Sequence, residues 1–295
     1  MTAVREIKLL KSFDHPNIIP IKEIMTDADG VSLVFEYMDY DLSGMLQQPN
    51  IKLRLPQIKY IAQEILKGLQ YLHENEIVHR DIKASNVLID SKGQVKLADF
   101  GLAKSTRIPF LAETRSEKRL MMTNRVITLW YRPLEILLGS IEYSYEVDMW
   151  GFGCLLMEMA TGKHPFSGAS NELGQIDQIV KVFPTEPFDS LKDLPWSALI
   201  DFDKIERTAE NSLRAQIKDM DLNLQDLILQ TLEIDPRKRL SARDAIHHPF
   251  FKSSPAPSLP SDLPAIEGEW HEFECKQRRK NPSAPKIANT NSSIR

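Results

Sequence analysis

The chain has 295 residues, of which 42% are hydrophobic and 26% charged, and its formal net charge is -4. These values are ordinary for a globular protein with a sizeable core; they exclude a mini-protein and give no indication of a nucleic-acid or membrane partner. The two cysteines, Cys154 and Cys275, lie far apart, which argues against a disulfide framework or a structural zinc site and indicates a reducing compartment.

The hydrophobic pattern also argues against a membrane span and against export. The most apolar stretch, residues 150–160, contains Glu158 and is shorter than the roughly 20 apolar residues that cross a bilayer. It therefore predicts a buried helix. The N-terminus lacks the charged start, apolar run and cleavage site of a secretory signal.

The first predicted element is a helix over residues 2–11, in which Ala3, Ile7 and Leu10 recur at helical spacing. The helix has no lead-in, so we expect the chain to begin inside an element and a segment to precede it. His15-Pro16-Asn17 ends the helix, and two short strands over residues 18–23 and 31–37 flank a turn at 27–30.

Further along the chain, Pro56 is suited to open a helix with one apolar face, formed by Ile58, Ile61, Ile65, Leu69 and Leu72. Short strands are predicted at 87–89 and 95–97, followed by a long polar loop over 102–128 and a mainly helical region to about residue 252. Beyond Ser253 a proline-rich run predicts an extended tether, and the last dozen residues are predicted to be disordered.

The chemistry is carried by His79-Arg80-Asp81-Ile82-Lys83-Ala84-Ser85-Asn86 followed by Asp99-Phe100-Gly101. Taken singly, Asp81, Asn86 and Asp99 would be interpreted as solvated turn residues. Together, in residue type and spacing, the two segments resemble the catalytic loop and the metal-binding turn of protein kinases.

By this resemblance Asp81 accepts the proton of the attacking hydroxyl, Asn86 and Asp99 bind Mg²⁺, and Lys83 offsets charge on the transferred phosphoryl group of ATP. Lysine at position 83 is also typical of serine/threonine kinases. Downstream, Trp130 to Glu135 and Asp148 to Gly153 continue the family's order, and Arg239 is expected to pair with Glu135. Kinases usually carry proline directly before that glutamate, whereas this chain has Leu134 preceded by Pro133.

Within the kinases, residues 2–7 resemble the cyclin-binding helix of cyclin-dependent kinases, and residues 33–38 resemble their hinge, with Phe35 as gatekeeper. The resemblance implies that Glu6 pairs with an ATP-contacting lysine, and it places Asp41 at the ribose. It also implies that the backbone of Glu36 and Met38 bonds adenine. Residues 126–132 resemble the family's pocket for proline-directed substrates.

Thr123 occupies the position of the activating phosphothreonine of this family, and its expected partners are Arg5, Arg80 and Lys104. Lysine at 104, where arginine is usual, cannot make the same bidentate contact with a phosphate. An isolated loop threonine would be an ordinary exposed residue; the fixed position of Thr123 before Thr128 and Trp130 favours the regulatory interpretation.

Several segments resemble transcriptional cyclin-dependent kinases that phosphorylate the repeat tail of RNA polymerase II. The resemblance implies a cyclin partner, Ser/Thr-Pro sites in a protein substrate, and a nuclear location. The segments are residues 12–17, 39–44 and 83–86, and also residues 270–274 with the basic run 276–280, which are similar to a C-terminal extension that folds back towards bound nucleotide. Such a basic run alone would be interpreted as a solvated surface or an import signal.

The Gly-rich loop and the strand lysine of kinases have no counterpart before the hinge. Two interpretations follow: the segment lies upstream of an incomplete chain, or the short form is real and acts as a catalytically impaired cyclin-binding or scaffold pseudokinase. Intact Asp81, Asn86 and Asp99 favour the enzyme. The expected fold is α+β and protein-kinase-like, with a partial N-lobe over residues 1–38, a mainly helical C-lobe over 39–252 and an extension over 253–295.

Overall fold

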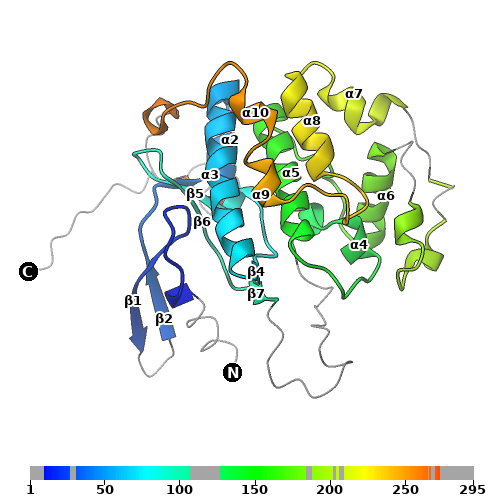
Figure 1. The fold of residues 1–295 in the computed structure, drawn as a ribbon, viewed down its shortest axis with the longest axis horizontal. Helices are drawn as coiled ribbons and strands as arrows, with labels where there is room; N and C mark the ends of the chain where they lie inside the picture. Colours follow the sequence, from blue (N-terminus) through cyan, green and yellow to red (C-terminus); the bar gives the residue numbers. More distant parts are fainter. Residues whose placement is uncertain are drawn as a thin grey trace, which may run out of the picture.

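The computed structural model describes residues 10–26, 31–106, 127–183, 188–201, 204–205, 209–264, 266 and 270–272. Figure 1 shows a mainly helical body from which the hairpin of β1 and β2 projects. Within the described residues no helix combines the length and the apolar character needed to cross a membrane.

The described strands are short and form three antiparallel groups. The first group pairs β1 (Ile21–Thr26) with β2 (Val31–Phe35); the second has the order β3-β5-β6, with β3 (Tyr40–Asp41), β5 (Val87–Ile89) and β6 (Val95–Leu97); the third pairs β4 (Ile77–Val78) with β7 (Lys104–Ser105). The predicted strands at 87–89 and 95–97 are confirmed.

The predicted strand over 18–23 is shifted in the structure, because β1 begins at Ile21. The residues before it bond to β6 instead: the Ile19 N–H donates to the Leu97 carbonyl at 2.9 Å, and the Leu97 N–H donates to the Asn17 carbonyl at 2.8 Å. Ile18 and Ile19 are each only 2% exposed. Their apolar side chains therefore belong to the core below the hairpin, and not to the hairpin itself.

The helices lie to one side of the β1–β2 hairpin (Figure 1). The α-helices are α2 (Leu42–Leu46), α3 (Leu55–Glu74), α4 (Leu134–Leu137), α5 (Glu146–Thr161), α6 (Glu172–Val182), α7 (Leu213–Ile217), α8 (Leu222–Thr231), α9 (Ala242–Ala245) and α10 (Pro249–Lys252). Short 3-10 turns are η1 (Ala84–Asn86), η2 (Leu129–Tyr131), η3 (Asp189–Leu191), η4 (Ser197–Leu199), η5 (Ala209–Asn211) and η6 (Pro260–Asp262).

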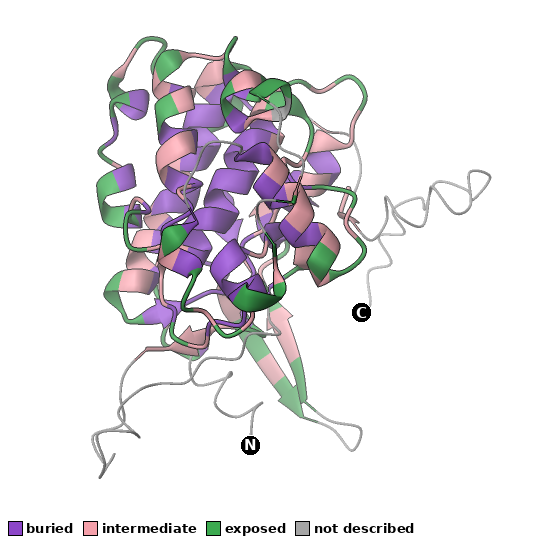
Figure 2. Cartoon of the chain, turned by 90° about the vertical axis from the view of Figure 1, so that its right-hand side faces the viewer, coloured by how far each residue is buried: buried purple, intermediate pink, exposed green. Residues whose placement is uncertain are grey.

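Helices α3 and α5 contribute many of the buried apolar residues. Figure 2 shows that the buried residues gather in the helices at the centre of the molecule. Pro56 lies in the first turn of α3, and the five predicted apolar positions of this helix are all buried, which confirms its predicted face. Helix α5 is buried almost throughout, as predicted for residues 150–160, and its Trp150 ring stacks on Phe166 with centroids 5.3 Å apart.

The predicted pair of Glu135 and Arg239 is confirmed. The guanidinium of Arg239 donates to both carboxylate oxygens of Glu135, at 2.8 and 3.2 Å, and the two side chains are 3% exposed or less. Arg239 also donates to the carbonyls of Glu146 and Glu233. Leu134, which replaces the usual proline, begins α4 and is fully buried, so the turn forms with leucine at this position.

The described residues of 253–264, 266 and 270–272, here called the C-terminal strap, run back across the start of α3 to β3. The fully buried Lys59 ammonium donates to the carbonyls of Ser253 and Pro255 at 2.7 and 2.8 Å. At the far end of the strap, the Asp41 N–H donates to the Trp270 carbonyl at 3.3 Å, and Tyr40 forms a parallel bridge with Trp270. The predicted tether is thus attached to the body at both ends of its described part.

Candidate active site

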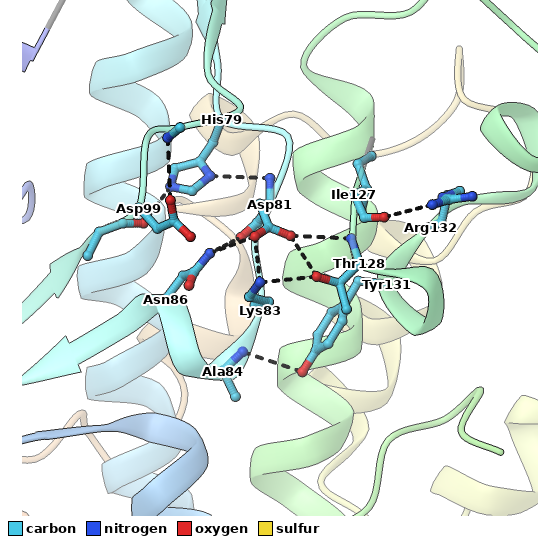
Figure 3. A network of polar contacts seen from close by, with 12 residues as sticks. His79, Asp81, Lys83, Ala84, Asn86, Asp99, Ile127, Thr128, Tyr131 and Arg132 are labelled. Carbon is cyan, nitrogen blue, oxygen red and sulfur yellow. Dashed lines mark hydrogen bonds and ion pairs between the residues drawn. The ribbon is translucent and has the colours of Figure 1, made fainter. Parts of the chain in front are cut away.

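The residues of the predicted catalytic loop lie between β4 and β5. Beyond the β5–β6 ladder, the Ala98 N–H donates to the Asn86 carbonyl at 2.9 Å. This bond brings Asn86 next to the segment that carries Asp99, so two of the predicted metal ligands, far apart in sequence, lie at the same end of one hairpin (Figure 3).

The start of the loop is fixed by Asp148, a buried carboxylate in the first turn of α5. Its two oxygens accept the backbone N–H groups of His79 at 2.9 Å and Arg80 at 2.8 Å, and the His73 ring lies 2.9 Å away. Arg80 adopts the left-handed region, with φ of 65°. The strained turn is stable because a buried acceptor satisfies both N–H groups.

Asp81 is the centre of the site (Figure 3). Its Oδ2 accepts from Lys83 Nζ at 2.6 Å and from Asn86 Nδ2 at 3.0 Å, while its Oδ1 accepts from the Thr128 hydroxyl at 2.8 Å and the Thr128 N–H at 3.3 Å. Lys83 Nζ also donates to the Thr128 hydroxyl at 3.1 Å. The carboxylate is therefore fixed in orientation, with residues from two distant segments around it.

Asp81 remains an anion in this setting. Burial acts to raise its pKa, but the hydrogen bond and positive charge of Lys83, together with the bonds from Thr128, outweigh burial and hold the pKa below its ordinary value. An ionised carboxylate can accept a hydrogen bond from a hydroxyl group placed next to it.

His79 has a structural role in this arrangement. Burial lowers the pKa of its ring, so the ring is neutral. Its Nδ1 accepts the Asp81 N–H at 3.3 Å, which leaves Nε2 to donate to the Ala98 carbonyl at 3.0 Å. The ring therefore links the loop that carries Asp81 to the strand end before Asp99.

Asp99 also adopts the left-handed region, with φ of 61°, and its carboxylate accepts the Gly101 N–H at 3.4 Å. Phe100 is buried between the rings of Phe13 and His79, with centroids 5.0 and 4.8 Å away. Within the described part of the chain, no three His, Cys, Asp or Glu side chains form a group able to hold a metal. An oxygen site for Mg²⁺ would therefore use Asp99 and the amide oxygen of Asn86, whose Nδ2 faces Asp81, with phosphate and water completing the shell.

The residues expected at the nucleotide follow β2. Phe35 ends β2 and is 38% exposed. The Glu36 N–H donates to the Pro20 carbonyl at 3.3 Å. This leaves the Glu36 carbonyl as the backbone group of that residue able to accept a hydrogen bond from adenine. Met38 is buried. Asp41 is the N-cap of α2: its Oδ1 accepts the Gly44 N–H and its Oδ2 the Glu272 N–H, both at 2.7 Å. A ribose hydroxyl would share this carboxylate with the strap.

Among the predicted regulatory residues, the structure describes Arg80 and Lys104. Arg80 Nε donates to the Leu102 carbonyl at 2.6 Å, and Lys104 lies in β7, paired with Val78. Arg5, Glu6 and Thr123 lie outside the described residues, so their roles stay predictions.

Sequence reasoning placed Thr128 in the segment 126–132, which resembles a substrate pocket, and Asp148 in a segment that continues the family's order. It did not predict the contacts of Thr128 with Asp81 and Lys83, nor the anchor that Asp148 forms for the loop. Asp148 is one of two acidic residues in the first turn of an otherwise apolar helix, and that position was the available signal for a buried acceptor. Thr128 lies 47 positions after Asp81, and no local pattern connects the two.

Next to Asp81 lies a pocket of about 660 Å³, which the structure adds to the predicted site. It extends from Lys83 and Thr128 past Trp130 to Glu158 in α5 and Glu272 in the strap. Both oxygens of Glu158 accept from the Tyr131 hydroxyl, at 2.7 and 2.8 Å.

The chain is similar in sequence to known protein kinases. Residues 1–251 match the model of the protein kinase domain. The chain is 42% identical to CTD kinase subunit alpha of Saccharomyces cerevisiae over 99% of its length and 39% identical to cyclin-dependent kinase C-2 of Oryza sativa over 94%. It spans about half of these relatives, 53% and 56% of their lengths.

Two solved structures share the fold. The crystal structure of the yeast RNA Pol II CTD kinase CTDK-1 complex matches 88% of this chain and 84% of the compared chain, with a TM-score of 0.79 and 42% identity. The CAK complex of Chaetomium thermophilum bound to ATP-gamma-S matches 90% of this chain and 81% of the other, with a TM-score of 0.78 and 33% identity. The expected α+β, protein-kinase-like fold is thereby confirmed.

Proposed function

Because the chain belongs to the protein kinase domain family and is related to its cyclin-dependent members, we propose that the protein transfers the γ-phosphate of ATP to serine or threonine residues that precede proline. The observation that carries the proposal is the Asp81 carboxylate, fixed by Lys83, Asn86 and Thr128.

In this proposal Asp81 accepts the hydrogen bond, and then the proton, of the substrate hydroxyl, because its lowered pKa keeps it ionised. Lys83, 2.6 Å from Asp81, would offset charge on the phosphoryl group during transfer. Asn86 and Asp99 would hold Mg²⁺, which when bound neutralises negative charge on the phosphates.

The nucleotide would lie along the hinge after β2. The Glu36 carbonyl and the backbone of Met38 would bond adenine beside Phe35, and Asp41 would meet the ribose. Glu6, outside the described residues, would pair with a lysine that contacts ATP. A relative in the CAK complex is bound to ATP-gamma-S, which supports the choice of ATP.

The preference for proline follows from Ile127. This β-branched residue has φ of 70°, and its carbonyl accepts from the Arg132 guanidinium at 3.0 Å. Left-handed backbone is uncommon for such a residue and costs of order 1–3 kcal/mol. The carbonyl is consequently turned to Arg132 and would be unable to accept an N–H from the substrate residue after the acceptor. Proline has no N–H to leave unbonded.

The likeness to CTD kinases supports the repeat tail of RNA polymerase II as substrate, a cyclin as partner and a nuclear location. Phosphorylation of Thr123 would add a group that pairs with Arg5, Arg80 and Lys104.

The proposed activity is tested with the full-length protein bound to its cyclin, by transfer of labelled phosphate from ATP to a Ser-Pro repeat peptide. Asp81→Asn keeps the size of the side chain but removes the base, so we expect the rate to fall at least about 100-fold. Asp189→Asn alters an exposed aspartate far from the site in sequence and should leave the rate unchanged. Full activity of the Asp81→Asn protein would overturn the assignment.

The proline preference is tested with three peptides, in which the acceptor serine precedes proline, N-methylalanine or alanine. Since N-methylalanine also lacks the N–H, it should be phosphorylated nearly as well as proline, and alanine about tenfold less efficiently. Equal rates with proline and alanine would contradict the role given to Ile127.

A further inference from the structure

Ser254 and Pro255 form the one place in the sequence where serine or threonine directly precedes proline. Both residues are exposed, and they lie where the C-terminal strap leaves α10. Within the described part of the chain, the Ser254 hydroxyl forms no hydrogen bond. The pair therefore has the chemistry that the proposed function requires of a substrate, an aliphatic hydroxyl followed by a residue without an N–H.

The residues on both sides of Ser254 are held by one buried cation. The Lys59 ammonium donates to the Ser253 carbonyl at 2.7 Å, to the Ser253 hydroxyl at 3.0 Å and to the Pro255 carbonyl at 2.8 Å. These three bonds use all the donors of an ammonium group. The Lys59 side chain is fully buried, and its nitrogen lies 5.1 Å from the centre of the Phe250 ring. The start of the strap is thus fixed to α3 through this one side chain.

The charge of Lys59 has no anionic partner at bonding distance. Among the described residues, Lys59 forms no ion pair with a carboxylate. Burial lowers the pKa of Lys59, and the negative charge of Asp221 opposes this change from beyond ion-pair distance. A buried ammonium that is bonded only to neutral oxygens would be stabilised by a further negative charge close to it.

A phosphate group on Ser254 would supply such a charge. At pH 7 it carries about -1.5 to -2. Consecutive Cα atoms are about 3.8 Å apart, and the carbonyls on both sides of Ser254 contact the ammonium. The phosphate would therefore lie within roughly 10 Å of Lys59, about one Debye length in 0.1 M salt. Because Lys59 is shielded from water, their attraction would be screened less than that between two exposed groups.

The phosphate would come from another copy of the protein. Lys59 lies near the start of α3, whereas the catalytic loop follows the end of this helix, roughly 20 Å further along its axis. An attached strap therefore holds Ser254 far from Asp81 of the same chain. Ser254 would leave Lys59, enter the active site of a second copy, and return to Lys59 after the transfer.

The transfer has a simple balance. The bond between the γ-phosphorus of ATP and the oxygen that bridges it to the β-phosphorus breaks, and the Ser254 oxygen forms the new bond to the γ-phosphorus. The hydroxyl proton passes to Asp81 of the acting copy, and ADP leaves.

We propose that Ser254 is a phosphorylation site for a second copy of this kinase, and that the buried charge of Lys59 then holds the phosphorylated strap more firmly. The proposal rests on the proposed kinase function. It adds to that function a modified state of the chain, in which the start of the strap is held by charge as well as by hydrogen bonds.

The site is tested with full-length protein bound to its cyclin. Asp81→Asn protein serves as the acceptor, because we expect it to be inactive; it is incubated with active protein and ATP, and the phosphate is located by mass spectrometry. We expect phosphate on Ser254, at a rate that rises with the concentration of the active copy. Pro255→Ala in the acceptor should lower this rate about tenfold, whereas Pro257→Ala, which keeps the Ser-Pro pair, should not.

A Ser-Pro repeat peptide in the same reaction separates the two proposals. Phosphorylation of the peptide without phosphorylation of Ser254 would overturn the site and leave the proposed function intact. Absence of transfer to both acceptors would overturn the proposed function, and this site with it.

The role of Lys59 is tested by the rate at which a non-specific protease cleaves the strap, before and after phosphorylation of Ser254. We expect phosphorylation to slow cleavage about fivefold. Lys59→Met should remove this difference, whereas Lys252→Met, a change at an exposed lysine two positions before Ser254, should keep it. The Lys252 variant keeps the test decisive if Lys59→Met fails to fold, because loss of the difference in Lys252→Met would assign the attraction to Lys252. Equal cleavage of the phosphorylated and unphosphorylated proteins would refute the firmer attachment.

Discussion

The carboxylates of this protein differ in role according to what surrounds them. Glu135 and Asp148 accept from groups fixed in the core, whereas Asp81 accepts from side chains that line an open pocket. Breaking a buried pair by removing one charge leaves the other uncompensated, which costs about 3 to 5 kcal/mol.

We therefore expect Glu135→Gln to lower the free energy of unfolding by about 3 to 5 kcal/mol, measured by urea denaturation. The matched control is Arg237→Leu, which breaks the pair with Asp235; the Arg237 side chain is 77% exposed, and the change should cost less than about 1 kcal/mol. If Glu135→Gln and Arg237→Leu lower the free energy of unfolding equally, burial does not determine how much the Glu135–Arg239 pair contributes to stability.

At the level of single residues, the sequence predicted the position of Asp81 because the family motif around it has a short, fixed spacing. It predicted the Glu135–Arg239 pair only through the resemblance to the family, since the two residues lie 104 positions apart. It did not predict the surroundings of Asp81 in full. Thr128 and Asp81 approach each other only through the packing of η2 against the catalytic loop, and Glu158 and Glu272 meet in one pocket although they are separated by more than 100 positions. Periodicity and local motifs carry no information on such distant contacts.

Among the elements, helix α2 and the end of the C-terminal strap pack directly against each other. A glycine within a helix normally disfavours it by about 1 kcal/mol relative to alanine. At position 44, however, alanine would not fit, because the Trp270 backbone occupies the space that a side chain would need.

Gly44→Ala should consequently detach the end of the strap, although alanine is the better helix former. We expect cleavage of the strap by a non-specific protease to become about tenfold faster. The rate of cleavage is measured by mass spectrometry of the fragments. Gly174→Ala in α6 serves as the control, since its added Cβ would find no neighbour nearer than 3.4 Å. Unchanged cleavage in Gly44→Ala would mean that the strap does not rest on α2.

The sequence predicted those helices and strands whose structure is determined by their own segment of the chain. The spacing of apolar residues was sufficient for α3, and the two short segments at 87–89 and 95–97 were sufficient for β5 and β6. The start of β1 was not predictable, because Ile18 and Ile19 are apolar and β-branched like strand residues but bond to the edge of β6. The course of the strap was expected only from the resemblance of residues 270–274 to an extension that folds back towards nucleotide. Local patterns do not contain it, since Lys59 and Asp41 hold the strap from distant positions.

For the whole molecule, the stabilisation that a bound ligand gives to the folded state tests the site without any measurement of phosphate transfer. A ligand that binds only the folded state stabilises it by about 2.7 kcal/mol at 100 times its Kd. Since Asn86 and Asp99 would hold Mg²⁺ between protein and phosphate, the metal should increase the stabilisation by ATP.

We expect ATP with Mg²⁺ to raise the Tm of the full-length protein more than ATP with EDTA does, in a thermal unfolding assay. Asp99→Asn should remove the difference between the two conditions. Asp81→Asn should keep it, because in the proposed function Asp81 meets the substrate hydroxyl and is not a metal ligand. If ATP with Mg²⁺ still raises the Tm of Asp99→Asn more than ATP with EDTA does, the metal is held by other residues.

The anchoring of the catalytic loop on Asp148 has a consequence for motion. Helix α5 passes through the centre of the core, and the N–H groups of His79 and Arg80 end on its first turn. Local opening of the loop would leave the buried Asp148 carboxylate without these two donors, so we expect the loop to open only together with the central helix. We therefore expect substrate exchange to proceed without a change in the shape of this loop.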